Sequence, residues 1–142
     1  MLRKVIFTVG ILGLANPAMA FQSCADAGIG LESLVPPAAS HSRYYFDNAV
    51  SLYVVDTIEP ACCSAGLAVV LPDPESPQGD FQCLAILNYR GLDLENASET
   101  DEGDKGIVLE IPTGGTLQDA DSQDGRVLRL RITPEPYTVS VE

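Results

Sequence analysis

Four cysteines are the residues of this 142-residue chain whose types and spacing most clearly predict chemistry. They are Cys24, Cys62, Cys63 and Cys83. An even number of cysteines in an exported chain is typical of disulfide bonds. Neighbouring side chains on an extended segment point to opposite faces, so Cys62 and Cys63 are expected to reach different partners. The predicted pairing therefore joins one of them to Cys24 and the other to Cys83.

The other uses of thiols fit these cysteines poorly. Structural zinc sites space their cysteine pairs by about two to four residues, and thiol redox enzymes use Cys-x-x-Cys. Neither spacing occurs in the sequence. Copper sites add histidine and methionine ligands, whereas His41 is the only histidine and both methionines, Met1 and Met19, precede Phe21. Disulfide bonds remain the favoured interpretation.

Acidic residues are the second source of candidate chemistry, because carboxylate oxygens are ligands for Ca²⁺. Asp119, Asp121 and Asp124 lie in a turn-rich stretch with Gly125. An EF-hand loop needs glycine at its sixth position and glutamate at its twelfth. Counted from Asp119, the glycine is one position late and Leu130 stands at the twelfth. The three aspartates are weak calcium candidates in an irregular loop, and no other cofactor is expected.

No catalytic residue is assigned from the sequence. The nucleophile motifs Gly-x-Ser-x-Gly and Ser-x-x-Lys are absent. His41 and Ser42 are neighbours, and neighbours on a strand point to opposite faces, so they cannot share the hydrogen bond that a serine hydrolase needs. The 20 acidic residues still form pairs by chance. A small secreted hydrolase using scattered carboxylates is therefore the enzymatic alternative.

The N-terminus predicts export. Two basic residues, Arg3 and Lys4, precede an apolar run from Val5 to Leu14 that is too short to span a bilayer. The small-x-small pattern of residues 18–20 follows. This arrangement is typical of a secretory signal peptide over residues 1–20, cleaved after Ala20. It predicts a periplasmic or secreted protein.

A lipoprotein signal is the alternative interpretation of the same region. It would place an acylated Cys24 at the new N-terminus and anchor the protein to a membrane. Lipid attachment is favoured by small aliphatic residues before the cysteine, and Phe21 and Gln22 fit that requirement poorly.

The predicted mature chain, residues 21–142, is strongly acidic. The formal net charge of the whole sequence is −12 at pH 7, and loss of Arg3 and Lys4 lowers it to −14. Such a chain repels nucleic acid and anionic lipid, and no later apolar run is long enough to span a membrane. A protein partner of basic character is the expected contact, with a divalent cation or simple solubility as alternatives.

One stretch concentrates the negative charge. Six acidic residues fall between positions 93 and 104. A run of like charges is typical of a solvated loop, so residues 90–106 are expected to form a long loop. Within it, Asp101, Glu102 and Asp104 are the weakly predicted contacts to a partner.

Alternating apolar residues predict the strands that position the cysteines and the acidic residues. The β patterns cover residues 43–47, 49–58, 67–71, 81–89, 107–111, 126–133 and 137–141. Segment 81–89 is apolar on both faces, which indicates a central strand covered on both sides. One short helical turn is expected near Leu31 to Leu34. The predicted fold is all-β: a small disulfide-stapled antiparallel sandwich or barrel of about six to eight short strands, in a single domain over residues 21–142.

These observations favour an exported, non-enzymatic interaction domain, such as an inhibitor, an adaptor or an accessory subunit, that acts through protein contact. The alternatives are the small hydrolase named above and a calcium-stabilised structural protein. A concave pocket with convergent polar groups would favour the enzyme. A flat surface or a free strand edge would favour the binding domain.

The first prediction concerns export. Cleavage after Ala20 should leave Phe21 as the mature N-terminus, because residues 18–20 supply the small-x-small pattern that signal peptidase recognises. The intact mass of the protein recovered from the exported fraction measures this directly. A mass that includes a diacylglyceryl group on Cys24 would contradict both the cleavage site and an unanchored mature chain.

Overall fold

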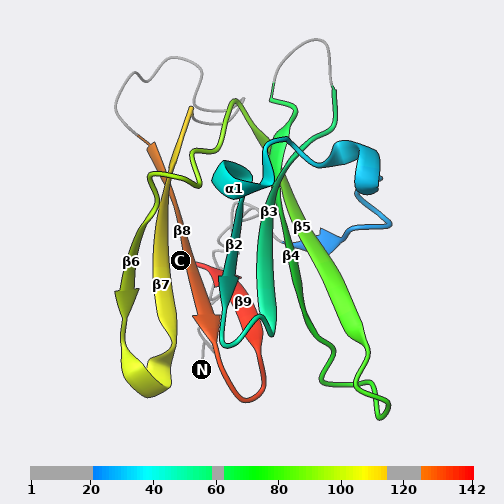
Figure 1. The fold of residues 1–142 in the computed structure, drawn as a ribbon, viewed down its shortest axis with the longest axis vertical. Helices are drawn as coiled ribbons and strands as arrows, with labels where there is room; N and C mark the ends of the chain where they lie inside the picture. The colour runs from blue at the N-terminus through cyan, green and yellow to red at the C-terminus, as the bar shows by residue number, and fades with distance from the viewer. Residues whose placement is uncertain (1–20, 59–62, 115–125) are drawn as a thin grey trace, which may run out of the picture.

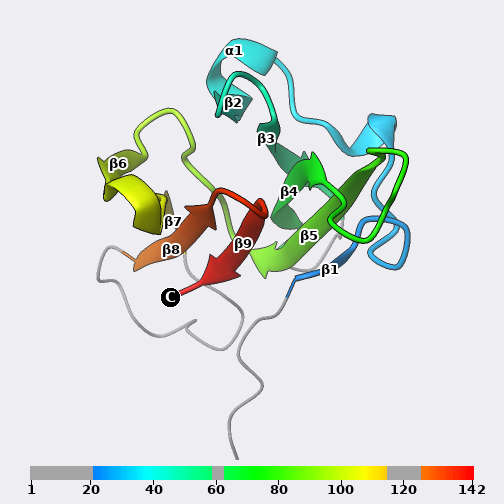
Figure 2. The ribbon, with the colours of Figure 1, turned by 90° about the horizontal axis from the view of Figure 1, so that it is seen from below.

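The computed structural model describes residues 21–58, 63–114 and 126–142. These residues form two antiparallel sheets that pack face to face (Figures 1 and 2). One sheet has five strands and the other has four. The predicted all-β, sandwich-like fold is confirmed.

Most strands of each sheet pair in chain order. The five-stranded sheet contains β1 (Gln22–Ser23), β2 (Ser42–Tyr45), β3 (Val50–Asp56), β4 (Ala65–Pro72) and β5 (Phe81–Tyr89). The four-stranded sheet contains β6 (Ser98–Asp101), β7 (Ile107–Thr113), β8 (Arg126–Thr133) and β9 (Thr138–Val141). The strand order is β1-β5-β4-β3-β2 in the first sheet and β6-β7-β8-β9 in the second. Three single helical turns lie between strands: the 3-10 helix η1 (Leu31–Ser33), α1 (Ala38–His41) and the 3-10 helix η2 (Gly103–Lys105). The helical turn expected near Leu31 is therefore present.

The core lies between the two sheets. On β3, Val50, Leu52 and Val54 face inward, because every second side chain of a strand points to the same face. On the opposing sheet, Leu130 and Ile132 are completely buried. Burial of one such side chain contributes about 1.5–3 kcal/mol, so the alternating pattern accounts for the pairing of these two faces.

The expectation of one long loop over residues 90–106 is wrong. Residues 98–101 form β6, which pairs with β7 in a register that sets Ser98 opposite Glu110 and Asp101 opposite Ile107. All four β6 residues are exposed, so they carry no apolar alternation from which a strand could be predicted. Backbone pairing with β7 forms the strand, and charged side chains are common on such edge strands.

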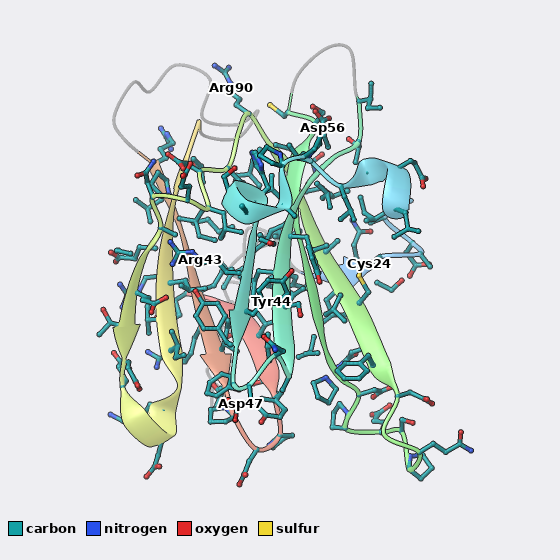
Figure 3. The ribbon with its side chains drawn as sticks, in the orientation of Figure 1. Cys24, Arg43, Tyr44, Asp47, Asp56 and Arg90 are labelled. Carbon is teal, nitrogen blue, oxygen red and sulfur yellow. A yellow bond between two sulfur atoms is a disulfide. The ribbon has the colours of Figure 1, made fainter. Side chains whose placement is uncertain are left out.

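Arg43 joins the edges of the two sheets (Figure 3). Its Nη2 donates hydrogen bonds to the backbone oxygens of Glu95 at 3.1 Å and Ala97 at 3.0 Å. Its Nη1 pairs with Glu99 on β6 at 3.3 Å. The Tyr45 hydroxyl donates to the same carboxylate at 3.0 Å, and burial raises the pKa of Tyr45, which favours the protonated donor. These contacts hold β2 beside β6.

A ladder of ion pairs covers the outward face of the four-stranded sheet. Arg129 pairs with Glu110 at 2.5 Å and with Glu142 at 3.0 Å. Arg131 pairs with Glu142 at 2.5 Å and with Glu102 at 2.6 Å. The register accounts for part of this arrangement, since Arg129 lies opposite Glu110 on the neighbouring strand. Hydrogen bonds from Arg131 and Arg129 lower the pKa of Glu142.

The predicted disulfide pairing is wrong. Cys24 is bonded to Cys83, and their Cα atoms are 5.3 Å apart. Cys24 follows β1, whose Ser23 lies opposite Leu84 of β5, and the Cys24 amide donates to the Cys83 carbonyl oxygen at 2.9 Å. A two-residue strand has no pattern to predict it, yet β1 brings the two cysteines side by side.

The other two cysteines are affected by this correction. Cys63 is also disulfide-bonded, whereas Cys62 lies outside the described residues. The partners predicted for Cys62 and Cys63 are bonded to each other, so the exclusion of a Cys62–Cys63 bond loses its premise.

The second prediction is that non-reducing peptide mapping finds the Cys24–Cys83 bond. Trypsin is unsuitable, because no lysine or arginine lies between Cys63 and Cys83. Cleavage before aspartate should place Cys24, the Cys62 and Cys63 pair, and Cys83 on three different peptides, since Asp26, Asp56, Asp73 and Asp80 separate them. A bond from Cys24 or Cys83 to the 56–72 peptide would contradict the structure.

The third prediction concerns stability in acid. Glu142→Gln should lower the free energy of unfolding at neutral pH, because it removes the carboxylate shared by Arg129 and Arg131. The folded-state pKa of Glu142 is lowered, so its contribution is present above the ordinary glutamate pKa of about 4.3 and is lost as pH falls through the folded pKa. Urea unfolding of wild type and variant at about pH 7 and about pH 2 measures this loss.

Glu75→Gln is the matched control for that experiment. Glu75 is exposed in the turn between β4 and β5 and takes part in no ion pair within the described part of the chain. Equal unfolding curves for Glu142→Gln and wild type at neutral pH would show that the ladder does not stabilise the fold.

Candidate functional site: an apolar groove

The outward face of the five-stranded sheet is uncharged across its centre. The register places outward side chains in two central rows: Tyr44, Ser51, Val70 and Cys83, then Ser42, Tyr53, Ala68 and Ala85. None of these side chains carries a charge at neutral pH. The inward side chains of β3, β4 and β5 pack on the four-stranded sheet, and the outward side chains of these strands are largely apolar as well. The outward face therefore needs cover of its own.

Residues 24–35 supply that cover on the side away from the four-stranded sheet (Figure 2). The segment is fixed at its start by the Cys24–Cys83 bond. It is fixed at its end by an antiparallel bridge between Leu34 and Val55 and by a 3.2 Å hydrogen bond from the Val35 amide to the Val54 carbonyl oxygen. A second buried cluster forms where Cys24 of this segment packs against Val55, Ala68 and Ala85 of the sheet.

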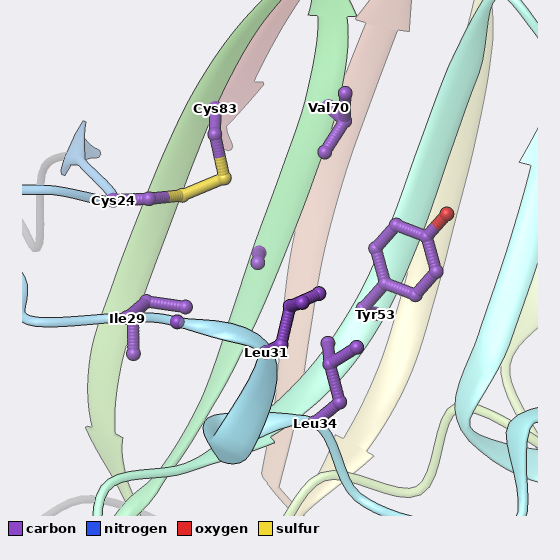
Figure 4. Close-up of a pocket in the computed structure, with 9 residues that line it drawn as sticks. Cys24, Ile29, Leu31, Leu34, Tyr53, Val70 and Cys83 are labelled. Atoms are coloured by element: carbon purple, nitrogen blue, oxygen red, sulfur yellow. A yellow bond between two sulfur atoms is a disulfide. The ribbon is translucent and has the colours of Figure 1, made fainter.

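A groove remains between this segment and the sheet (Figure 4). Its volume is about 480 Å³. The wall is formed by Ile29, Gly30, Leu31 and Leu34, the floor by Tyr53, Ala68 and Val70, and the Cys24–Cys83 disulfide also lines it. The lining is predominantly aliphatic and aromatic, so the groove is suited to an apolar occupant.

Large apolar side chains are exposed on the face of the five-stranded sheet that carries the groove. Leu31 is 87% exposed and Leu34 is 40% exposed. Tyr44 is 52% exposed and meets Tyr53 edge-to-face, with ring centroids 6.2 Å apart. Phe81, at the far end of β5, is 62% exposed. Single exposed apolar residues are common, but neighbouring ones around a hollow are typical of interaction sites.

The predicted acidic contact residues lie on the other sheet. Asp101 Oδ1 accepts a hydrogen bond from the Gly103 amide at 2.8 Å. Glu102 pairs with Arg131, and Asp104 is exposed within η2. Two of the three carboxylates thus have intramolecular partners, and the proposed contact through all three stays a prediction.

The other sequence-predicted site residues are not assembled into a site. Asp119, Asp121 and Asp124 lie outside the described residues, and their calcium binding stays a prediction. Within the ranges 21–58, 63–114 and 126–142, no group of three or more histidine, cysteine or acidic residues is arranged to hold a metal ion. None of the helices in those ranges is long and apolar enough to cross a membrane.

His41 has a local structural role. Its Nδ1 lies 2.9 Å from the Pro37 carbonyl oxygen and 3.4 Å from Ser40 Oγ. The neighbouring Ser42 hydroxyl instead donates to the Ala38 carbonyl oxygen at 2.6 Å. Both side chains therefore cap the short helix α1, as their separate hydrogen bonds show.

The groove was missed by sequence reasoning, although part of its signal was present. Segment 81–89 was expected to be covered on both faces, and β4 reads as a nearly continuous apolar run. Both features indicate a second apolar face. They do not indicate that residues 24–35 cover that face only in part, because this depends on the contact between Cys24 and Cys83.

Comparison with known proteins gives no family for this chain. No protein-family model, no curated protein and no solved structure matches it.

Proposed function

We propose that this protein is an exported, non-enzymatic interaction domain that binds a partner protein through the groove on the outward face of the five-stranded sheet. One observation carries the proposal. Leu31 and Leu34 are exposed beside a preformed apolar hollow, where a partner's side chains would cover them.

The chemistry of the lining supports binding rather than catalysis. Tyr53 contributes the one side-chain hydroxyl among the lining residues. The two lining cysteines are joined in a disulfide, so neither offers a thiolate nucleophile. General acid-base catalysis needs a positioned group that gains and loses a proton near working pH. The lining is better suited to apolar contact.

The groove is held in shape before any partner arrives. Residues 24–35 are tethered by the disulfide at one end and by pairing of Leu34 and Val35 with β3 at the other. A preorganised surface loses less conformational entropy on binding. Burial of an exposed leucine contributes about 1.5–3 kcal/mol, so Leu31 is the strongest candidate anchor.

Export is part of the proposal. The leader predicted over residues 1–20 directs the chain to the periplasm or the exterior, and the Cys24–Cys83 bond is compatible with an oxidising compartment. The same bond supports an unanchored chain. A lipoprotein carries its diacylglyceryl group on the cysteine sulfur, and that sulfur of Cys24 is bonded to Cys83.

The fourth prediction is that Leu31→Ser weakens partner binding without destabilising the protein. Immobilised mature protein would capture its partner from the native envelope fraction, and the purified partner would then be titrated calorimetrically. Loss of one buried leucine, about 1.5 kcal/mol or more, should raise the dissociation constant about tenfold. The unfolding free energy should change by less than about 0.5 kcal/mol, because Leu31 is 87% exposed.

Val127→Ser is the matched control. Val127 is an exposed apolar residue on β8 of the other sheet, with 53% exposure. Its removal should leave the dissociation constant unchanged. If the partner binds both variants with wild-type affinity, the groove is not the binding site.

A further inference from the structure

We propose that the segment bound in the groove is basic as well as apolar, with an apolar anchor flanked by lysine or arginine. This inference rests on the proposed function and adds the charge of the partner. It follows from the distribution of charge around the groove.

The segment that supplies the wall of the groove carries only negative charge. Residues 24–35 contain two ionisable side chains, Asp26 and Glu32. The Glu32 carboxylate lies against Gly30, which lines the groove: a Cβ at Gly30 would be 2.6 Å from Glu32 Oε1. This carboxylate is therefore at the rim, next to the exposed anchor Leu31.

The floor and its extensions add no positive charge. Asp56 is the only charged residue in β3, β4 and β5. The turn that joins β4 to β5 begins at Asp73, three residues beyond Val70, and contains three exposed or half-buried acids, Asp73, Glu75 and Asp80. Every charged side chain in these strands and this turn is therefore negative.

The one basic residue nearby is already engaged. Arg43 is the only lysine or arginine between residues 21 and 89. Its guanidinium contacts Glu99 and the backbone oxygens of Glu95 and Ala97, all on the side of the four-stranded sheet. It therefore compensates an acid of the other sheet rather than Glu32 or Asp26.

On the outward face of the four-stranded sheet, by contrast, acidic side chains are paired with basic ones. Its outward acids Glu102, Glu110 and Glu142 are paired with Arg129 and Arg131. On the groove side, Asp26 and Glu32 form no ion pair with another described residue. Exposed charges act over about 8 Å at physiological salt. This range is long enough for the Glu32 carboxylate to favour positively charged over negatively charged partner residues beside an anchor.

Charge complementarity then defines the occupant. Lysine or arginine beside the anchor would be attracted by the carboxylates of this segment, Glu32 first, whereas acidic flanks would be repelled and desolvated at a cost. An anionic lipid surface is disfavoured for the same reason. A polypeptide segment that alternates apolar and basic side chains meets both requirements.

Three synthetic peptides of equal length test this inference: alternating leucine and lysine, leucine and glutamate, and serine and lysine. Their dissociation constants would be measured by fluorescence anisotropy at low and at physiological salt. The leucine–lysine peptide should bind the wild-type protein at least about tenfold tighter than either of the others, and added salt should reduce that advantage.

Two sets of variants locate the effect. Asp26→Asn combined with Glu32→Gln should weaken leucine–lysine binding severalfold and reduce its salt dependence. The matched control neutralises two exposed acids outside the five-stranded sheet, Glu95→Gln before β6 with Glu135→Gln in the turn between β8 and β9, and changes the net charge equally. The control should bind as wild type does, and Leu31→Ser should abolish tight binding by any leucine peptide.

The outcomes separate the two proposals. Equal binding of both leucine peptides, lost in Leu31→Ser, would leave the groove as a binding site and overturn the basic partner. Equal weakening by the control variant, or equal binding of the serine–lysine peptide, would overturn the inference as non-specific attraction. No binding of either leucine peptide would overturn the groove itself.

Other occupants give their own signatures. Sedimentation that shows self-association of the wild type but not of Leu31→Ser would assign the groove to a second copy of this chain. Leu31-dependent binding to phosphatidylcholine vesicles would assign it to lipid. Either result overturns the basic polypeptide partner.

Discussion

The five-stranded sheet has two apolar faces, but only one of them meets the other sheet. β3, β4 and β5 place Leu52, Leu67 and Ile86 toward the main core and Val55, Ala68 and Ala85 to the opposite side. Apolar surface is stabilised by removal from water, so the second face requires a cover. Residues 24–35 are that cover, and the positions of β1, η1 and the Cys24–Cys83 bond follow from the need to hold it against the sheet.

The two outward faces of the sandwich differ in the side chains that they present to solvent. On the four-stranded sheet, charged side chains form a ladder in which Arg129 and Arg131 connect three glutamates. Exposed ion pairs contribute little stability individually, but they leave these side chains engaged with one another. On the five-stranded sheet, the cover is incomplete and leaves an apolar groove, with the Glu32 carboxylate against its lining residue Gly30. A partner of the kind proposed would gain more binding free energy on the outward face of the five-stranded sheet. Burial of the apolar side chains of that face is favourable, and no intramolecular ion pair must be broken.

The agreement between sequence patterns and structure is closest where one strand has a buried face. The strands predicted at 81–89 and 126–133 have the bounds found for β5 and β8, because their apolar side chains must point toward a core. β6 was missed because all of its side chains are exposed, and β1 was missed because two residues carry no period. The predicted disulfide pairing was wrong because β1 was not predicted, and β1 is the strand that places Cys24 beside Cys83. The groove was missed for the same reason.

Composition and local periodicity by themselves determined the acidic character of this protein and the all-β class of its fold, because charge is a sum over residues and strand alternation is local. The tertiary structure alone decided which cysteines meet, which edges lie together through Arg43, and where apolar side chains remain exposed. These features join positions as distant as Cys24 and Cys83, which are 59 residues apart in the sequence. Contacts at such separation depend on the packing of whole sheets, and no local pattern contains them.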